Sequence, residues 1–302
     1  MMLPHDPASP AVDLPAVAPS ALRQACARCG LDGRGARLIR LFATAVYHLP
    51  AADAVARISL MTSLDVRARL ETSVRVTRWL NEIGFPSVEP LPVDQPVISH
   101  GCVVTFWRYL SQDGFRPDPA DLGHLLRGLH QLDPPPVPLP AYQPLVSVRR
   151  AVESSCAIGE DERNWLGVRC KQLLDAYGQL SFELPVGMIH GDAYRGNLLR
   201  DGHRVVLADW DAVSIGPRET DLIPTLQAPR FGLPRDERDA FIAAYGYDIR
   251  SWHGYPVLRD IRELSTLTAL LRDGQTGTTA QRELQIRLRS LRTGDDQQWT
   301  PF

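Results

Sequence analysis

The segment from residue 186 to residue 209 constrains the fold of this chain more than any other part. Apolar residues at 186–190 predict a short strand that leads into the polar stretch HGDAYRGN. Further strand segments follow at 198–199 and 204–208, and the Asp-Gly pair at 201–202 between them is typical of a tight turn. The pattern therefore predicts a strand, a polar loop and a hairpin in direct succession.

Three polar side chains in this segment are arranged as phosphoryl transfer requires. The returning strand brings Asn197 and Asp209 to neighbouring strand ends, where two oxygen ligands can share a hard cation such as Mg2+. Asp192 lies in the loop and can accept the proton of an attacking hydroxyl group, while most of the catalysis is electrostatic. The segment thus predicts a magnesium-dependent kinase with ATP or GTP as co-substrate.

The part of the chain that precedes this segment is predicted to be rich in β-structure. Residues 41–49 and 54–60 have the pattern of two strands, and residues 50–53 between them predict the turn of a hairpin. A helix is expected over 66–83, because a glycine and then a proline follow as stop signals. The apolar and aromatic run at 102–110 predicts a buried strand.

Helical patterns dominate after Gly114. Asp118 and Pro119 form a favourable N-cap and first helical position, and leucines follow on one stripe. A proline-dense linker over 134–144 separates this helix from the next ones. Further helices are expected within 162–177 and over 235–245, 255–272 and 278–291. The predicted fold class is α+β, with a small β-rich N-terminal part and a larger, mainly helical C-terminal part.

Composition narrows the possible partners. The 302 residues carry a formal net charge of -2, which gives no general attraction to nucleic acid or anionic membranes, and no apolar run reaches membrane-span length. The five cysteines are odd in number and scattered, which favours a reducing cytoplasm over a disulfide framework. Cys26 and Cys29 fall in an expected helix and are interpreted as structural. Residues 1–19 are proline-rich and are expected to form a flexible tail.

A longer stretch of the chain resembles a known family. Residues 187–222, GMIHGDAYRGNLLRDGHRVVLADWDAVSIGPRETDL, resemble the aminoglycoside phosphotransferase and choline kinase-like branch of the protein-kinase-like fold. The resemblance implies a bilobal protein, with an N-terminal nucleotide-binding lobe at 20–110 and a C-terminal catalytic and substrate-binding lobe at 111–302.

The family motif assigns roles to residues of the central segment. By resemblance, Asp192 matches the catalytic aspartate, and Asn197 and Asp209 match the metal ligands. His190 matches a residue that supports the loop, and Asp221 matches an aspartate whose carboxylate holds the loop backbone.

The resemblance also implies contacts to the nucleotide from the N-terminal lobe. Arg57 matches the cation that binds the α- and β-phosphates, with Glu71 as its carboxylate partner, although a surface arginine and a solvated helix acid explain them as well. Backbone groups near Arg108 and Leu110 are expected to meet the nucleobase. The expected phosphate-covering loop at 41–46 departs from the protein-kinase pattern, because it contains no glycine.

The acceptor is left open by the sequence. An antibiotic of aminoglycoside or nucleoside type, a sugar and an amino alcohol all remain candidates, with resistance or metabolism as the role. A cationic aminoglycoside needs a pocket of carboxylates, and an ordinary mixed surface explains the available acids equally well. Asp211 is one candidate for contact with metal or substrate. The candidates on the later helices are Asp236, Glu237, Asp239, Asp260 and Glu263.

Two other classes of protein compete with the kinase hypothesis. A catalytically silent, kinase-like nucleotide-binding module would usually have lost one of Asp192, Asn197 and Asp209, and all three are present. A metal-dependent hydrolase that uses His190, Asp192 and Asp209 would need further ligands at metal spacing, and none stands out.

Overall fold

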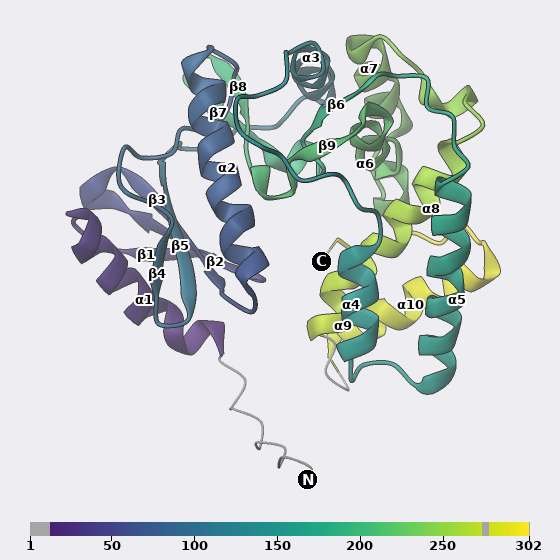
Figure 1. Cartoon of the computed structure of the whole chain (residues 1–302), viewed down its shortest axis with the longest axis horizontal. Coiled ribbons are helices and arrows are strands. Elements are labelled where there is room, and N and C mark those ends of the chain that lie inside the picture. The colour runs from purple at the N-terminus through teal and green to yellow at the C-terminus, as the bar shows by residue number, and fades with distance from the viewer. Residues whose placement is uncertain (1–12, 274–277, 302) are drawn as a thin grey trace. The chain divides into compact units, whose positions relative to one another are not determined.

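The computed structural model describes residues 13–273 and 278–301, and the chain divides into two compact units (Figure 1). One unit holds the chain up to Asp113 together with Arg200–Gly202, and the other holds Gly114–Leu199 and His203–Phe302. The first contains an antiparallel sheet and two helices, and the second is mainly helical. The α+β fold class predicted from the sequence is therefore confirmed.

The sheet of the first unit has the strand order β1-β2-β3-β5-β4, and every pair is antiparallel. The predicted hairpin is present as β2 and β3, while β1 and β4 were not foreseen as separate strands. Every residue of β1 is exposed, so its RLIRL sequence shows no alternation that would reveal a strand. The strand bounds are β1 Arg37–Leu41, β2 Thr44–Leu49, β3 Ala54–Leu60, β4 Val97–Ser99 and β5 Cys102–Arg108.

Two helices accompany this sheet. Helix α1 (Leu14–Cys29) packs on β2, β3, β4 and β5, and its buried side chains join the core of the unit. It begins inside the stretch expected to be a tail, because a proline is tolerated in the first helical turn and an apolar stripe follows. Residues 1–12 of that expected tail lie outside the described residues. Helix α2 (Leu64–Glu82) packs on β5 and ends before Gly84, which adopts φ 78°.

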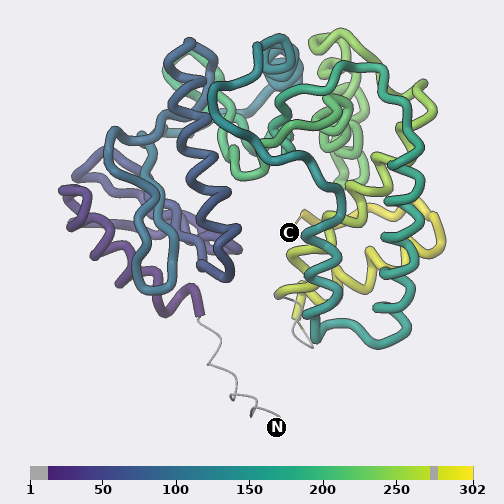
Figure 2. The backbone as a smooth tube through the Cα atoms, viewed as in Figure 1, coloured from purple at the N-terminus to yellow at the C-terminus, as the bar shows by residue number. Residues whose placement is uncertain are grey.

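The second unit is built around a close contact between α3 (Pro119–Leu129) and α7 (Arg235–Tyr245). The Asp118 side chain caps α3 by accepting a hydrogen bond from the Ala120 N–H at 2.9 Å. Gly123 permits the close approach, since a Cβ there would lie 2.6 Å from the Phe241 carbonyl oxygen. Figure 2 lets the reader follow the path of these helices.

The remaining helices largely follow the sequence pattern. The single helix expected over 255–272 is two helices, α8 and α9, which part at Thr266. The short α4 was not foreseen, and the glycine expected to end α9, Gly274, lies outside the described residues. The bounds are α4 Val146–Ser154, α5 Glu160–Tyr177, α6 Ile223–Leu226, α8 Tyr255–Ser265, α9 Leu267–Asp273 and α10 Thr279–Thr293. In the part of the chain that the structure describes, no helix is long and apolar enough to cross a membrane.

The segment between α5 and α6 forms two small two-stranded sheets. Strand β6 (Val186–Ile189) pairs antiparallel with β9 (Ser214–Pro217), a partner that the sequence analysis did not identify. Strand β7 (Leu198–Asp201) pairs with β8 (Arg204–Leu207), as expected. The two sheets fix both ends of the polar loop that connects β6 to β7.

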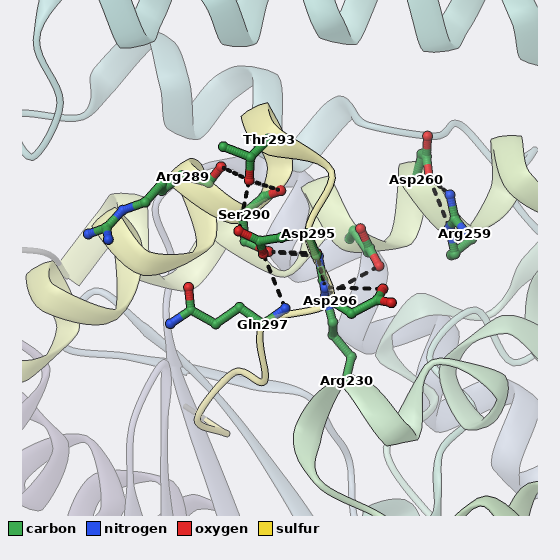
Figure 3. A network of polar contacts seen from close by, with 10 residues as sticks. Arg230, Arg259, Asp260, Arg289, Ser290, Thr293, Asp295, Asp296 and Gln297 are labelled. Carbon is green, nitrogen blue, oxygen red and sulfur yellow. Dashed lines mark hydrogen bonds and ion pairs between the residues drawn. The ribbon is translucent and has the colours of Figure 1, made fainter.

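The segment after α10 is tied to the helical unit by a polar network (Figure 3). Arg230 donates hydrogen bonds to the Ser290 hydroxyl and to the Asp295 carbonyl oxygen. Its guanidinium also lies 4.3 Å from the ring centre of Trp299, and the backbone N–H of Trp299 donates to the Arg230 carbonyl oxygen. This end of the described chain is therefore anchored by side chains from two separate helical segments.

Candidate active site

The loop between β6 and β7 is held by one buried carboxylate. Asp221 is fully buried, and its two oxygens accept hydrogen bonds from the backbone N–H groups of His190 and Gly191, both at 2.7 Å. Hydrogen bonds from neutral N–H groups to a carboxylate are about twice as strong as those between neutral groups. Asp221 thereby fixes the loop backbone immediately before Asp192.

Asp221 is itself positioned from α3 and α7. His130 places Nε2 3.2 Å from the Asp221 carboxylate and Nδ1 2.8 Å from the hydroxyl of Tyr245. Burial raises the pKa of Tyr245 above its ordinary value, so the phenol keeps its proton and donates it to Nδ1. Nε2 of His130 then donates to Asp221, which makes a continuous chain of hydrogen bonds to the loop.

His190 is a structural part of the loop. Its ring is fully buried beside Trp210, with ring centres 4.7 Å apart. Nε2 lies 2.9 Å from the Ala208 carbonyl oxygen and must donate to it, while Nδ1 accepts from the Asp192 N–H at 3.3 Å. These partners require the neutral tautomer with its proton on Nε2, so both ring nitrogens already have partners.

Only glycine fits at position 191. Gly191 adopts φ 81°, and a Cβ on it would lie 2.3 Å from the carbonyl oxygen of Ala212. The left-handed backbone and the close approach both exclude a side chain. The glycine of the HGD sequence therefore has a steric reason.

Asn197 and Asp209 are brought together by the β7–β8 hairpin. The Ala208 N–H donates to the Asn197 carbonyl oxygen at 2.8 Å, which places Asp209 next to Asn197 across the two strands. The Asn197 side chain is buried, and its Nδ2 donates to the Asp192 carbonyl oxygen at 2.9 Å. Because the nitrogen is used in this way, Oδ1 is the atom of Asn197 that remains to bind a ligand. Asp209 adopts φ 64°, a left-handed conformation that is uncommon outside glycine and concentrates at functional sites.

The oxygen donors of Asn197 and Asp209 fit a magnesium ion. Magnesium usually takes one or two protein oxygens and completes its octahedron with phosphate oxygens and water. Within the described residues, no group of three or more His, Cys, Asp and Glu side chains forms a metal cage. Two oxygen donors match the number of protein ligands that magnesium takes when it is bound together with a nucleotide.

Asp192 lies against an arginine of α8. Oδ1 of Asp192 is 2.8 Å from Nη1 of Arg262, and the Asp192 side chain keeps 37% exposure. Arg262 was not foreseen from the sequence, because nothing in the local pattern of α8 distinguishes it from the other arginines of that helix. Its position depends on how α8 packs in the second unit.

The first unit contains the residues expected to bind phosphates. Arg57 lies in the middle of β3, paired in register with Val46 on β2 and Thr105 on β5, and its side chain is half-buried. Glu71 is exposed on α2. The ion pair between Arg57 and Glu71 remains a prediction.

The end of β5 carries the groups expected to meet a nucleobase. The Arg108 N–H already donates to the Glu89 carbonyl oxygen at 2.9 Å, so it is not available to a base. Its side chain pairs with Glu89 and Asp201, both in the first unit. The Leu110 carbonyl oxygen accepts from Gln112, whereas its N–H has no hydrogen-bond partner among the described residues. Leu110 therefore keeps a backbone donor that a ligand can use.

The acids considered for substrate binding lie mostly in ion pairs with arginine. Glu263 is almost completely buried and lies 3.6 Å from Arg230, which gives it a role inside the helical unit rather than at a substrate. Asp211 is half-buried in the short helical turn that follows Asp209. Asp236 is exposed and accepts from the Glu237 N–H. The other arginine pairs are Glu237 with Arg195, Asp239 with Arg250, and Asp260 with Arg169 and Arg259.

A second buried acid supports the start of β6 and was not foreseen. Glu219 is fully buried, and one of its oxygens accepts from the N–H groups of Glu183 and Leu184, both at 2.7 Å. It stands two residues before Asp221 in the sequence PRETDL, so a pair of acids at this spacing was the available signal.

Comparison with known proteins gives one family and a set of related folds. A family model described as the phosphotransferase enzyme family matches residues 42–260. No curated protein matches the sequence.

Several solved structures resemble the whole chain. An amicoumacin kinase in complex with AMP-PNP, Ca2+ and Ami has a TM-score of 0.69 at 15% identity, over 94% of this chain and 95% of that one. A microcompartment-associated aminopropanol kinase has a TM-score of 0.67 at 15% identity, over 90% of this chain and 94% of that one. A choline/ethanolamine kinase family protein from Mesorhizobium loti has a TM-score of 0.63 at 18% identity, over 92% of this chain and 94% of that one. At these identities, the likeness establishes a shared fold.

Proposed function

The chain belongs to the phosphotransferase enzyme family, and we propose that it transfers the γ-phosphoryl group of ATP or GTP to a small molecule. The protein-kinase-like fold and the transfer to a hydroxyl group, both predicted from the sequence, agree with the family match and with the solved kinases. The identity of the nucleotide and of the acceptor belongs to the proposal.

One observation carries the assignment of the site. The β6–β7 loop and the β7–β8 hairpin together bring a partly exposed carboxylate at Asp192, an amide oxygen at Asn197 and a second carboxylate at Asp209 to one place. The amide nitrogen of Asn197 is bound to the carbonyl oxygen of Asp192, so the residue that would hold metal and the residue that would orient the acceptor share one rigid contact. Positioning and charge stabilisation are what phosphoryl transfer demands of a protein.

Each residue has a definite task in the proposed reaction. Asp192 accepts a hydrogen bond from the acceptor hydroxyl, orients it and takes its proton late in the transfer. Asn197 and Asp209 would hold Mg2+, which when bound neutralises charge on the nucleotide phosphates. Asp221 and His190 keep the loop in place and do not take part in proton transfer.

We assign nucleotide binding to the first unit. The half-buried Arg57 on β3 supplies a cation for the phosphates, with Glu71 as its proposed partner. The free N–H of Leu110 supports a contact with the edge of the base. The side chain of Arg108 is held in ion pairs, so its proposed contribution is to shape this end of β5.

The acceptor is proposed at the level of chemical class. The solved structures with this fold include phosphotransferases named for amicoumacin, spectinomycin, aminopropanol and choline or ethanolamine. An antibiotic or a sugar-like alcohol is therefore a reasonable first panel, and action on an antibiotic would make the protein a resistance enzyme. The five unpaired thiols are compatible with a cytoplasmic location, which is also proposed.

A nucleotide-consumption screen tests the proposed function. Purified protein with Mg2+ and ATP or GTP is offered aminoglycosides, nucleoside antibiotics, sugars, amino alcohols and hydroxy acids, and nucleoside diphosphate release is measured. We expect acceptor-dependent release with at least one class. Nucleotide binding that depends on magnesium but gives no turnover with any class would instead support a silent binding module.

A further inference from the structure

Arg262 is the cation nearest to the proposed catalytic carboxylate. It extends from α8, and its Nη1 lies 2.8 Å from Oδ1 of Asp192. Both residues belong to the second unit, so their contact is internal to one compact part of the chain. The proposed reaction described above gives this arginine no task.

The ion pair leaves one oxygen of Asp192 open. Oδ1 is buried against the guanidinium and makes no hydrogen bond of good geometry, although the side chain as a whole is 37% exposed. The exposed oxygen is therefore Oδ2. An acceptor hydroxyl that binds Oδ2 would place the neighbouring atoms of the acceptor beside the guanidinium of Arg262.

The guanidinium still has donors to offer. An arginine carries five N–H donors, and in the described part of the chain Arg262 has Asp192 as its partner and no other. Its side chain is 30% exposed, so a ligand can reach the remaining donors. Five other arginines of this unit differ from Arg262. Each of them is bound to a carboxylate or carbonyl group that lies outside the β6–β7 loop. These are Arg163, Arg169, Arg195, Arg230 and Arg250.

Among the described residues, Asp192 is the one carboxylate that pairs with Arg262. Tyr142 lies close enough for the charge of Arg262 to act on it, but burial raises the pKa of this phenol well above its ordinary value, so it stays neutral. The acids at Glu237 and Asp260 are held by other arginines. The region around Arg262 therefore contains an available cation and no unpaired cluster of carboxylates among these residues.

We infer that Arg262 forms an anion-binding subsite for the acceptor, and that the preferred acceptor carries a carboxylate or phosphate group close to the hydroxyl that it presents to Asp192. The inference rests on the proposed function, because it assumes that Asp192 receives the acceptor. A planar guanidinium binds either anion through paired hydrogen bonds, and it repels an ammonium group in the same position.

Acceptors that share a skeleton and differ only in charge test the inference. 3-Hydroxypropionate, 1,3-propanediol and 3-aminopropanol present the same hydroxyl beside a negative, a neutral and a positive group, and glycerol phosphates extend the series to a phosphate. We expect kcat/KM to be highest for carboxylate- or phosphate-bearing acceptors and lowest for the ammonium compound. Comparison of the carboxylate and phosphate arms identifies which anion the subsite prefers.

Variants connect that preference to one side chain. Arg262→Gln should raise KM for the anionic acceptors by about 10- to 100-fold, the loss expected when hydrogen bonds to a charged group are removed. Arg262→Lys should restore part of the affinity, and Arg262→Glu should turn the preference toward the ammonium compound. Arg259→Gln is the matched control, since Arg259 lies one turn earlier on α8, pairs with Asp260 and should leave KM unchanged.

The outcomes separate the two levels of the proposal. Absence of nucleotide turnover, including slow hydrolysis with water as acceptor, would overturn the proposed function itself. Turnover that favours ammonium-bearing acceptors and is unaffected by Arg262→Gln would overturn the subsite alone. If Arg262→Gln lowered the rate of turnover equally for every acceptor and for water, the subsite would also be overturned. That result would place Arg262 on the γ-phosphate of the nucleotide.

Discussion

At the scale of single residues, the site is defined by side chains that hold the backbone rather than by reactive groups. Asp221 binds two N–H groups of the loop, and His130 and Tyr245 hold Asp221 from behind. His190, the most conspicuous titratable residue of the motif, uses both ring nitrogens within the loop. The proposed chemistry is thus left to Asp192, Asn197 and Asp209.

Asp221→Asn tests the buried clamp. An asparagine replaces one acceptor oxygen by an N–H donor, which would face a backbone N–H inside the protein. We expect a loss of about 1 to 3 kcal/mol or more in the free energy of unfolding, measured by denaturant titration, together with a large fall in kcat. Asp175→Asn removes an exposed ion pair with Lys171 on α5 and should change stability by less than about 1 kcal/mol. Equal stability of the two variants would contradict the role given to Asp221.

Gly191→Ala tests the steric requirement of the loop. The added Cβ would lie 2.3 Å from a backbone oxygen at φ 81°, so we expect a severe loss of stability and activity. Gly202→Ala is a matched control, because Gly202 has φ 60° but no atom within 4 Å of the added Cβ. That control should cost only the strain of a left-handed alanine, about 1 kcal/mol. Thermal unfolding measures the loss of stability in both variants. A smaller loss for Gly191→Ala than for Gly202→Ala would refute the steric requirement at position 191.

At the scale of elements, the sequence predicted those helices and hairpins whose ends are marked by nearby stop or turn residues. Helix α7 has the bounds Arg235–Tyr245 expected from its stop at Gly246, and the β7–β8 hairpin follows from its Asp-Gly turn. The exposed β1 and the short β4 were missed, because their pairing depends on partners elsewhere in the sheet. The break between α8 and α9 was also missed, since the leucine pattern continues across it. The proximity of Asp192, Asn197 and Asp209 could be predicted from their spacing, whereas the position of Arg262 beside Asp192 depends on how a distant helix packs.

Gly123→Ala tests the packing of α3 on α7. A Cβ at this position would lie 2.6 Å from the Phe241 carbonyl oxygen, so the helices would have to separate. We expect a loss of about 1 to 3 kcal/mol, and weaker support of Asp221 through His130 should lower kcat as well. Gly167→Ala, at an exposed position of α5 with no atom within 4 Å, should instead stabilise the protein by about 0.5 to 1 kcal/mol. Chemical denaturation would reveal the opposite signs, and a stabilising effect at 123 would count against the packing described.

At the scale of the whole molecule, the chain forms two units whose cores are built differently. The first unit buries α1 and one face of an antiparallel sheet, and the second packs helices around two short two-stranded sheets. The turn at Arg200–Gly202 belongs by its contacts to the first unit, where Asp201 pairs with Arg108. Sequence order alone does not show this assignment, because it depends on contacts between residues that are far apart in the sequence.

The buried cysteines allow the cores of both units to be tested. Burial raises the pKa values of Cys26 and Cys170 to about 11, whereas Cys156 is exposed. The folded state therefore favours the protonated thiols, and stability should fall as pH rises from the ordinary thiol range near 9 toward 11.

In native protein at pH 8, an alkylating reagent should label Cys156 first, as peptide mass spectrometry can show. Early labelling of Cys26 or Cys170 would contradict the described cores.

The central claim is that Asp192 receives the acceptor hydroxyl while Asn197 and Asp209 serve the metal and nucleotide. The most direct test is phosphoryl transfer by Asp192→Asn, compared with the wild type at equal nucleotide saturation, after an acceptor has been found. We predict that kcat falls by about 100- to 10,000-fold, the usual contribution of a positioned proton acceptor, while the Kd for magnesium nucleotide stays within about threefold. Wild-type turnover by Asp192→Asn would contradict the account.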